Sequence, residues 1–231
     1  VMGSTGTGKS SFVKLLTGNS SVKIGTALDS ETSSVQVLRF LDPVSRRNVV
    51  VVDTPGFDDS RTGFTDTQIL ATITKFLLNE YDGNRKLNAL VYLQRISDPR
   101  FGGQTSRNLK MFQSLCGANN YKNVIVLTTF WDRVDVEEEG LKREEQLRSR
   151  YLKDLLDGGA RFMRYNQTIR SAQRVLAHVM TLTPTNVDIQ REIRMEGKSL
   201  EDTAAGSVHR EEVERIIAKH NKEVSELRTE L

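Results

Sequence analysis

Residues 3–10 read Gly3-Ser4-Thr5-Gly6-Thr7-Gly8-Lys9-Ser10 and match the phosphate-binding pattern G-x-x-x-x-G-K-[ST] at every defined position. Glycines let a backbone pass close to phosphate oxygens, and the main-chain N–H groups then converge on them at the start of the next helix. Lys9 brings a positive charge to the β- and γ-phosphates, and the Ser10 hydroxyl is an oxygen ligand for Mg²⁺. An apolar stub precedes the loop and a helical pattern follows it, which argues against a chance glycine-rich turn. The stretch predicts a triphosphate site.

A second signature follows an apolar run, Val49 to Val52, and reads Asp53-Thr54-Pro55-Gly56. An acid at the end of a buried strand can hold a magnesium-bound water, which makes Asp53 a metal-site candidate together with Ser10. The N–H of Gly56 can contact a γ-phosphate, a contact that is lost on hydrolysis, so the loop after it is expected to act as a switch. Asp-Thr-Pro-Gly is typical of GTPases, and the chain lacks the Leu-Ser-Gly-Gly-Gln signature of transporter ATPases.

A base-reading residue is expected after the apolar run Val124 to Leu127, where the chain reads Thr128-Thr129-Phe130-Trp131-Asp132. Most GTPases carry Asn-Lys-x-Asp here, and the aspartate accepts hydrogen bonds from guanine N1 and N2. Asp132 keeps the aspartate position, while Thr129 replaces the asparagine and Phe130 the lysine. The alternative is that Asp132 caps the next helix.

Another magnesium ligand is expected between the phosphate loop and Asp53, within Thr26 to Ser34. Thr32 has the best position, just before a predicted edge strand, and is grouped with Lys9 as a catalytic candidate; Ser30, Ser33 and Ser34 remain alternatives. Ras-like enzymes orient the attacking water with a glutamine directly after Asp-x-x-Gly, and this chain has Phe57 there. We therefore expect slow hydrolysis by the isolated chain. By position, Asp58, Asp59 and Arg61 are candidates to help.

Strand patterns alternate with helical ones, which predicts a doubly wound α/β fold with a mostly parallel sheet, helices on both faces and a C-terminal helical tail. The predicted strands are 34–41 at the sheet edge, 48–53, 87–93, 123–129 and 161–165. The predicted helices are 9–17, 66–79, 105–116, 136–156 and 168–180.

The chain divides into a G domain at 1–182, a polar linker at 183–207 and a helix at 208–231. Only two residues precede the phosphate loop, so we expect its first strand to be truncated. The last segment carries a four–three stripe, which indicates either a coiled coil with a partner or an amphipathic helix packed on its own domain. The stripe consists of Val213, Ile217, His220, Val224, Leu227 and Leu231.

Composition is that of an ordinary globular protein, with 37% hydrophobic and 27% charged residues and a net charge of +3. The charges are mixed along the chain, so we expect no nucleic-acid partner. No window is apolar enough for a transmembrane helix, and the single cysteine, Cys116, fits a reducing, cytoplasmic compartment.

These motifs together resemble the septin-related branch of GTPases, and above all the immunity-associated (GIMAP-type) G domains. The resemblance covers residues 1–182 and includes a stretch that runs from Leu155 to Asn166. It implies that Asn166 reaches the base and that two copies pair across the nucleotide, with Arg95 or Arg100 reaching the partner's phosphates. The full set of expected nucleotide contacts is Gly3, Ser4, Thr5, Gly6, Thr7, Gly8, Lys9, Ser10, Ser11, Asp53, Gly56, Thr129, Asp132 and Asn166.

The leading hypothesis is a switch that binds GTP or GDP with Mg²⁺ and hydrolyses GTP slowly, helped by dimerisation or a partner. Two alternatives remain. One is an assembly or scaffold module in which the nucleotide is structural. The other is an ATP-using P-loop enzyme, favoured only by the missing Asn-Lys pair.

Overall fold

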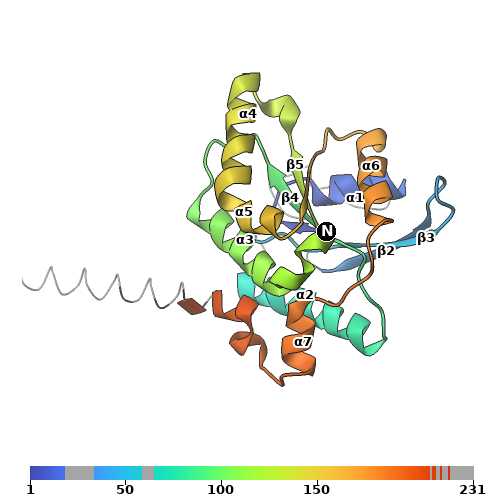
Figure 1. Ribbon diagram of the computed structural model, residues 1–231, viewed down its shortest axis with the longest axis vertical. Helices are drawn as coiled ribbons and strands as arrows, with labels where there is room; N and C mark the ends of the chain where they lie inside the picture. The colour runs from blue at the N-terminus through green and yellow to red at the C-terminus, as the bar shows by residue number, and fades with distance from the viewer. Residues whose placement is uncertain (19–33, 59–64, 209, 212–213, 215–217, 219–231) are drawn as a thin grey trace, which may run out of the picture.

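The computed structural model describes residues 1–18, 34–58, 65–208, 210–211, 214 and 218, and its strands form a four-stranded sheet and a two-stranded sheet with helices packed around them (Figure 1). Parallel pairing runs in the order β1-β4-β5-β6, and β2 forms an antiparallel ladder with β3. The strands are β1 (Met2–Gly3), β2 (Gln36–Leu41), β3 (Asn48–Asp53), β4 (Leu90–Arg95), β5 (Val124–Thr129) and β6 (Arg161–Arg164).

Val1 links the two ladders. Its main-chain nitrogen donates to the carbonyl of Val52 at 2.7 Å, and its carbonyl accepts from the N–H of Thr54 at 3.4 Å. The β2–β3 ladder thus lies beside β1, and β2 is at the sheet edge, as the sequence predicted. The mostly parallel, doubly wound fold is confirmed.

The central strands β4 and β5 are buried on both faces because their residues alternate between two cores. Tyr92 and Val126 point to one side, and Leu93 and Leu127 to the other. Helices α1 (Lys9–Thr17) and α6 (Ile169–Val179) cover the second side, and α2 (Asp66–Asp82) and α3 (Gly103–Cys116) cover the first. A capping box starts α2: the N–H of Gln68 donates to the Thr65 hydroxyl, and the Gln68 side chain accepts from the N–H of Thr65.

The helix predicted at 136–156 is divided. It consists of α4 (Glu137–Gln146), a π-helical turn η4 (Leu147–Tyr151) and α5 (Lys153–Asp157). The N–H of Leu152 donates to the carbonyl of Leu147 at 2.8 Å, an i to i+5 bond. This wider turn lets Leu147, Leu152 and Leu155 all face the core, which the spacing of five residues would prevent in a regular helix.

The segment predicted as a polar linker, 183–207, packs on the domain, so the linker interpretation is wrong for these residues. Helix α7 (Asp188–Arg194) lies against α2 and α3 (Figure 1), and Val187, Ile189 and Ala205 belong to the core. Its polar residues are used internally: the amide of Gln190 donates to the carbonyl of Leu77 and accepts from the N–H of Val187. Polar residues of this segment such as Gln190 therefore bind buried partners inside the domain, some of them distant in sequence, and do not face solvent as linker residues would.

Short 3₁₀ turns complete the chain: η2 (Ala118–Asn123), η3 (Trp131–Arg133) and η5 (Leu200–Asp202). The stripe at Val213, Ile217, His220, Val224, Leu227 and Leu231 lies outside the described residues, and so does the predicted coiled-coil contact. Within the part of the chain that is described, no helix has the length and apolar character to cross a membrane.

The packing of α7 gives a test of domain extent. Ile189 is fully buried, so Ile189→Ala is expected to lower the free energy of unfolding by about 2–5 kcal/mol, through lost transfer energy and the cavity left behind. Met195, at the end of the same helix, is 71% exposed, and Met195→Ala should change the free energy of unfolding by less than about 0.5 kcal/mol. Urea unfolding followed by circular dichroism measures both. Equal, small effects would show that α7 does not contribute to the domain core.

Candidate functional site

The phosphate loop joins β1 to α1 at the carboxyl edge of the parallel strands, where ligands bind in open α/β sheets. Gly3 has a φ of 142°, and a Cβ there would lie 2.5 Å from the carbonyl oxygen of Leu93, so only glycine lets the loop leave β1 beside β4. Gly8 has a φ of 92° and directly precedes α1 without a side-chain cap. The amino end of α1 therefore faces the loop with its own N–H groups.

Lys9 is folded into the centre of this loop. Its ammonium group donates to the carbonyls of Gly3 at 3.0 Å and Ser4 at 2.9 Å, and the residue is buried. The Thr7 hydroxyl donates to the same Ser4 carbonyl at 2.8 Å. The positive charge is thus held where the loop wraps, at the place where β- and γ-phosphates would need it.

Ser10 and Asp53, which the sequence predicts as Mg²⁺ ligands, contact each other. The Ser10 hydroxyl donates to Oδ2 of Asp53 at 2.6 Å, while the buried Oδ1 of Asp53 has no hydrogen-bond partner among the described residues. Burial raises the pKa of Asp53, against the opposing effect of the hydrogen bond from Ser10. A buried carboxylate oxygen without a partner, beside a hydroxyl, fits Mg²⁺, which prefers hard oxygen ligands. Thr32, Ser30 and Ser33 lie outside the described residues.

The Asp-Thr-Pro-Gly turn packs directly on the phosphate loop. Ser4 and Phe57 form an isolated parallel bridge, in which the N–H of Thr5 donates to the Phe57 carbonyl at 2.9 Å and the N–H of Phe57 to the Gly3 carbonyl at 3.3 Å. A Cβ on Gly56 would lie 2.5 Å from the Thr5 hydroxyl. The turn can approach this closely because residue 56 is glycine.

The side chains of Phe57 and Asp58 point in different directions. The Phe57 ring is fully buried in the core between the sheet, α2 and α3, so it does not face the nucleotide side. Asp58 has a φ of 68°, and its carboxylate accepts hydrogen bonds from Asn108 of α3 and from the Ser4 side chain. Burial raises the pKa of Asp58 to about 6. The sequence offered Asp58 by position only, and it gave no signal for Asn108.

On the predicted base side, Thr129 and Phe130 are tied to the phosphate loop. The buried Thr129 hydroxyl donates to the carbonyl of Thr7 at 3.0 Å. Phe130 adopts a left-handed conformation with a φ of 58°, and its ring lies 3.6 Å from the place a Cβ on Gly8 would take. The guanidinium of Arg133 lies 4.5 Å from the ring centroid. The two residues that depart from Asn-Lys thus still brace the loop.

Asp132 and Asn166 follow neighbouring strand ends, because β5 and β6 pair in parallel up to Thr128 and Arg164. Asp132 is exposed in η3, and since α4 begins after Val136, Asp132 does not cap that helix. The helix-cap alternative is therefore wrong. Asn166 is exposed, and its side-chain oxygen accepts from the Thr168 hydroxyl at 2.9 Å.

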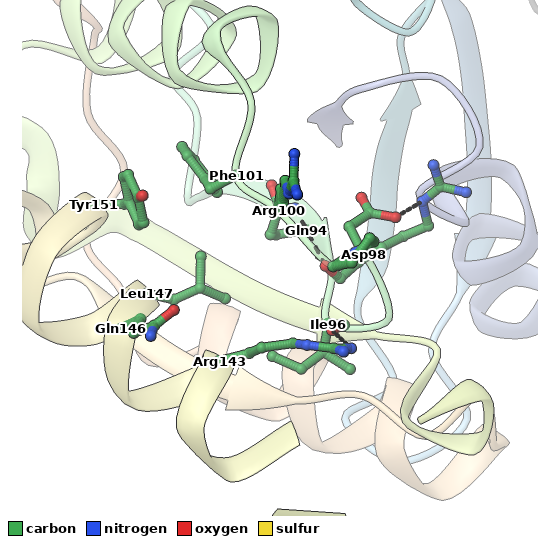
Figure 2. A pocket seen from close by; sticks show the side chains of 11 residues that line it. Gln94, Ile96, Asp98, Arg100, Phe101, Arg143, Gln146, Leu147 and Tyr151 are labelled. Atoms are coloured by element: carbon green, nitrogen blue, oxygen red, sulfur yellow. Dashed lines mark hydrogen bonds and ion pairs between the residues drawn. The ribbon is translucent and has the colours of Figure 1, made fainter. Parts of the chain in front are cut away.

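A cavity of about 340 Å³ opens beside the loop that follows β4, between that loop and α4–η4 (Figure 2). Arg95 points to the phosphate loop: its guanidinium lies 3.6 Å from a Cβ built on Gly6, and it pairs with Asp98 at 3.1 Å. Arg143 reaches across from α4 to the carbonyl of Ile96 at 3.2 Å. Arg100, on the cavity wall, is exposed and forms no ion pair with the described residues.

Solved structures with the same fold include components of the chloroplast translocon. Toc33 from Arabidopsis thaliana in complex with GDP and Mg²⁺ is 16% identical, with a TM-score of 0.61 over 81% of this chain and 86% of Toc33. A dimerisation-deficient arginine-to-alanine mutant of Toc33 is 17% identical, with a TM-score of 0.59 over 84% of this chain and 83% of that one. A structure from work on dimerisation and GTPase activity of atToc33 and psToc159 is 18% identical, with a TM-score of 0.59 over 82% and 80%.

Comparison of the sequence with protein families identifies the family of this chain. No curated protein matches the chain, but the model of the AIG1 family matches residues 1–222, well beyond the 182 residues of the expected domain. This match confirms the resemblance to immunity-associated G domains that the phosphate loop, the Asp-Thr-Pro-Gly turn and Asp132 indicated. The chain therefore belongs to the AIG1 family, and it is a P-loop GTPase G domain.

Proposed function

We propose that this chain is a GTP- and Mg²⁺-dependent conformational switch that hydrolyses GTP slowly alone and faster when two copies pair across the nucleotide. One observation carries the switch: the turn that ends in Gly56 is hydrogen-bonded to the phosphate loop and lies against Thr5. Any group that binds at Thr5, as a γ-phosphate would, must therefore change or fix the position of this turn.

Each residue of the site has a task in this proposal. Lys9 and the N–H groups of the loop bind the phosphates, and the oxygens of Ser10 and Asp53, with Thr32, hold Mg²⁺. An ion held there would supply positive charge against the negative charge that develops on the phosphates. Asp132 selects guanine by accepting hydrogen bonds from N1 and N2, and Asn166 lies on the same rim. Thr129 positions the loop through its bond to Thr7.

Pairing across the nucleotide rests on Arg100 and on the relatives. One of the similar Toc33 structures is a dimerisation-deficient arginine-to-alanine mutant, and dimerisation is described as important for the GTPase activity of atToc33 and psToc159. Arg95 pairs with Asp98 beside its own phosphate loop, whereas Arg100 is exposed and unpaired within the described residues. Arg100 is therefore the better candidate to reach a partner's phosphates. A cytoplasmic location, supported by the single buried thiol of Cys116, completes the proposal.

Guanine selection is tested by a competition titration of GTP against ATP, with Mg²⁺, on the natural chain and on Asp132→Asn. Replacing the carboxylate removes a charged acceptor, so GTP affinity should fall about 10–100-fold while xanthosine triphosphate gains affinity. Asp135→Asn, an exposed carboxylate in the same loop, is the matched control and should change neither. Equal binding of ATP and GTP, unaffected by Asp132→Asn, would refute guanine recognition at this site.

Sensing of the γ-phosphate is tested at Gly56. In Gly56→Ala the added methyl group pushes the turn away from Thr5, so affinity for a non-hydrolysable GTP analogue should fall about tenfold while GDP affinity is kept. Gly103→Ala is the control, because a Cβ there meets nothing within 4 Å. Isothermal titration of both nucleotides distinguishes the outcomes. An equal loss for GDP and the GTP analogue would show that Gly56 maintains the loop and does not sense the third phosphate.

Dimer-dependent hydrolysis is tested by turnover per chain as protein concentration rises. The natural chain should accelerate with concentration, and Arg100→Ala should remove that acceleration while the rate of the dilute chain stays unchanged, since an arginine supplied in trans acts only in the pair. Arg194→Ala, which loses an exposed pair with Asp82, should behave like the natural chain. A rate per chain that does not depend on concentration in the natural protein contradicts this part of the proposal.

A further inference from the structure

We propose that Asp58 orients the attacking water in GTP hydrolysis, in place of the glutamine that Phe57 replaces, and that Asn108 of α3 is the positioning residue that holds its carboxylate. The inference rests on the proposed function, because it assigns a residue to the hydrolysis step of that same site.

The backbone excludes Phe57 from this task and makes Asp58 the next candidate. The bridge to Ser4 fixes the main chain of Phe57, and the ring is fully buried in the core. The chain then turns through the left-handed conformation of Asp58, with a φ of 68°. This turn brings the Asp58 side chain back onto the phosphate loop, where it contacts Ser4, the neighbour of Thr5. Asp58 is thus the first side chain after Gly56 that faces the loop.

Two helices anchor this position. Asn108, fully buried in α3, donates its amide to the Asp58 carboxylate and lies 3.5 Å from the Ser4 hydroxyl. The N–H of Asp58 donates to Asp66 of α2 at 3.0 Å, and the other oxygen of Asp66 accepts from Gln104 of α3 at 2.7 Å. A loop residue held by neighbours from α2, α3 and the phosphate loop is placed for a definite task rather than solvated as a surface charge.

The charges around Asp58 suit a hydrogen-bond acceptor. Burial is the main influence and raises its pKa to about 6; the hydrogen bonds from Asn108 and Ser4 and the charge of Lys9 lower it, and the charge of Asp66 raises it. The Asn108 amide, which contacts both the Asp58 carboxylate and the Ser4 hydroxyl, places this carboxylate beside the phosphate loop. Tyr92 of β4 is neutral, since burial, followed by the charge of Asp58, raises its pKa. Asp58 is therefore ionised at neutral pH, with neutral donors as its direct contacts.

GTP hydrolysis needs one group that accepts a hydrogen bond, and then a proton, from the attacking water. In hydrolysis the water oxygen bonds to the γ-phosphorus, and the bond from that phosphorus to the bridging oxygen breaks, with its electron pair leaving on GDP. An Asp58 oxygen accepts a hydrogen bond from the water and takes its proton, which returns to solvent after product release. Only the ionised carboxylate can do this, so the rate should decrease as pH falls through the pKa of Asp58.

The experiment is single-turnover hydrolysis of saturating GTP, from about pH 5 to 8, with GTP and GDP affinities measured alongside. Asp58→Asn keeps the shape and removes the acceptor charge; we expect the rate to fall about 10–100-fold, both affinities to stay within about twofold, and the acidic limb near pH 6 to disappear. Asp58→Glu should recover part of the rate. Asp82→Asn, a carboxylate at the far end of α2, is the control and should keep the natural profile.

Asn108→Ala separates positioning from catalysis. Because the amide of Asn108 lowers the pKa of Asp58, its removal should move the acidic limb to higher pH and reduce the rate at neutral pH, with nucleotide affinity kept. A natural rate in nucleotide-bound Asp58→Asn would overturn the inference while leaving the switch intact. Loss of both affinities and of cooperative unfolding in Asp58→Asn would show a structural role and also overturn it. Absence of GTP binding by the natural chain would instead refute the proposed function.

Discussion

The short parallel bridge between Ser4 and Phe57 is the contact on which the site depends. Through it the phosphate loop and the Asp-Thr-Pro-Gly turn share main-chain hydrogen bonds, and Gly56 is brought against Thr5. The bridge also fixes the orientation of two side chains. The Phe57 ring is buried in the core, and the Asp58 carboxylate contacts Ser4 of the phosphate loop. Because backbone groups make this contact, no substitution of a single polar side chain removes it.

The loop is braced on its other side by different chemistry. A hydroxyl of β5, on Thr129, binds the Thr7 carbonyl, and the Phe130 ring covers the start of α1 near Gly8. A threonine and a phenylalanine thereby support the loop where most GTPases use an asparagine and a lysine. A threonine side chain is shorter than an asparagine side chain. The Thr129 hydroxyl can therefore bind the Thr7 carbonyl only because β5 and the loop lie close together.

Local patterns predicted the phosphate loop, Asp53 and the sheet because each depends on neighbours in sequence. The glycines, Lys9 and Ser10 form one motif, and the apolar runs before Asp53 and Thr128 specify buried strands. Asn108 could not be found this way, since its partner Asp58 lies 50 residues earlier. The segment 183–207 reads as a polar linker because partners such as that of Gln190, the carbonyl of Leu77, lie as far as 113 residues away. The π-helical turn could not be predicted for another reason. The helical pattern from 136 to 156 is continuous, and only the burial of both Leu147 and Leu152 requires the wider turn.

Helix α7 touches both α2 and α3, and these are the two helices that anchor Asp58 through Asp66 and Asn108. At its start, Asp188 lies against Gly117 at the end of α3, and Gln190 is bonded to the last turns of α2. Because α7 contacts both helices, the positions of α2 and α3 relative to each other are tied to its packing. Helix α7 therefore joins the far ends of the two helices whose other parts hold Asp58, and it fixes the spacing between them.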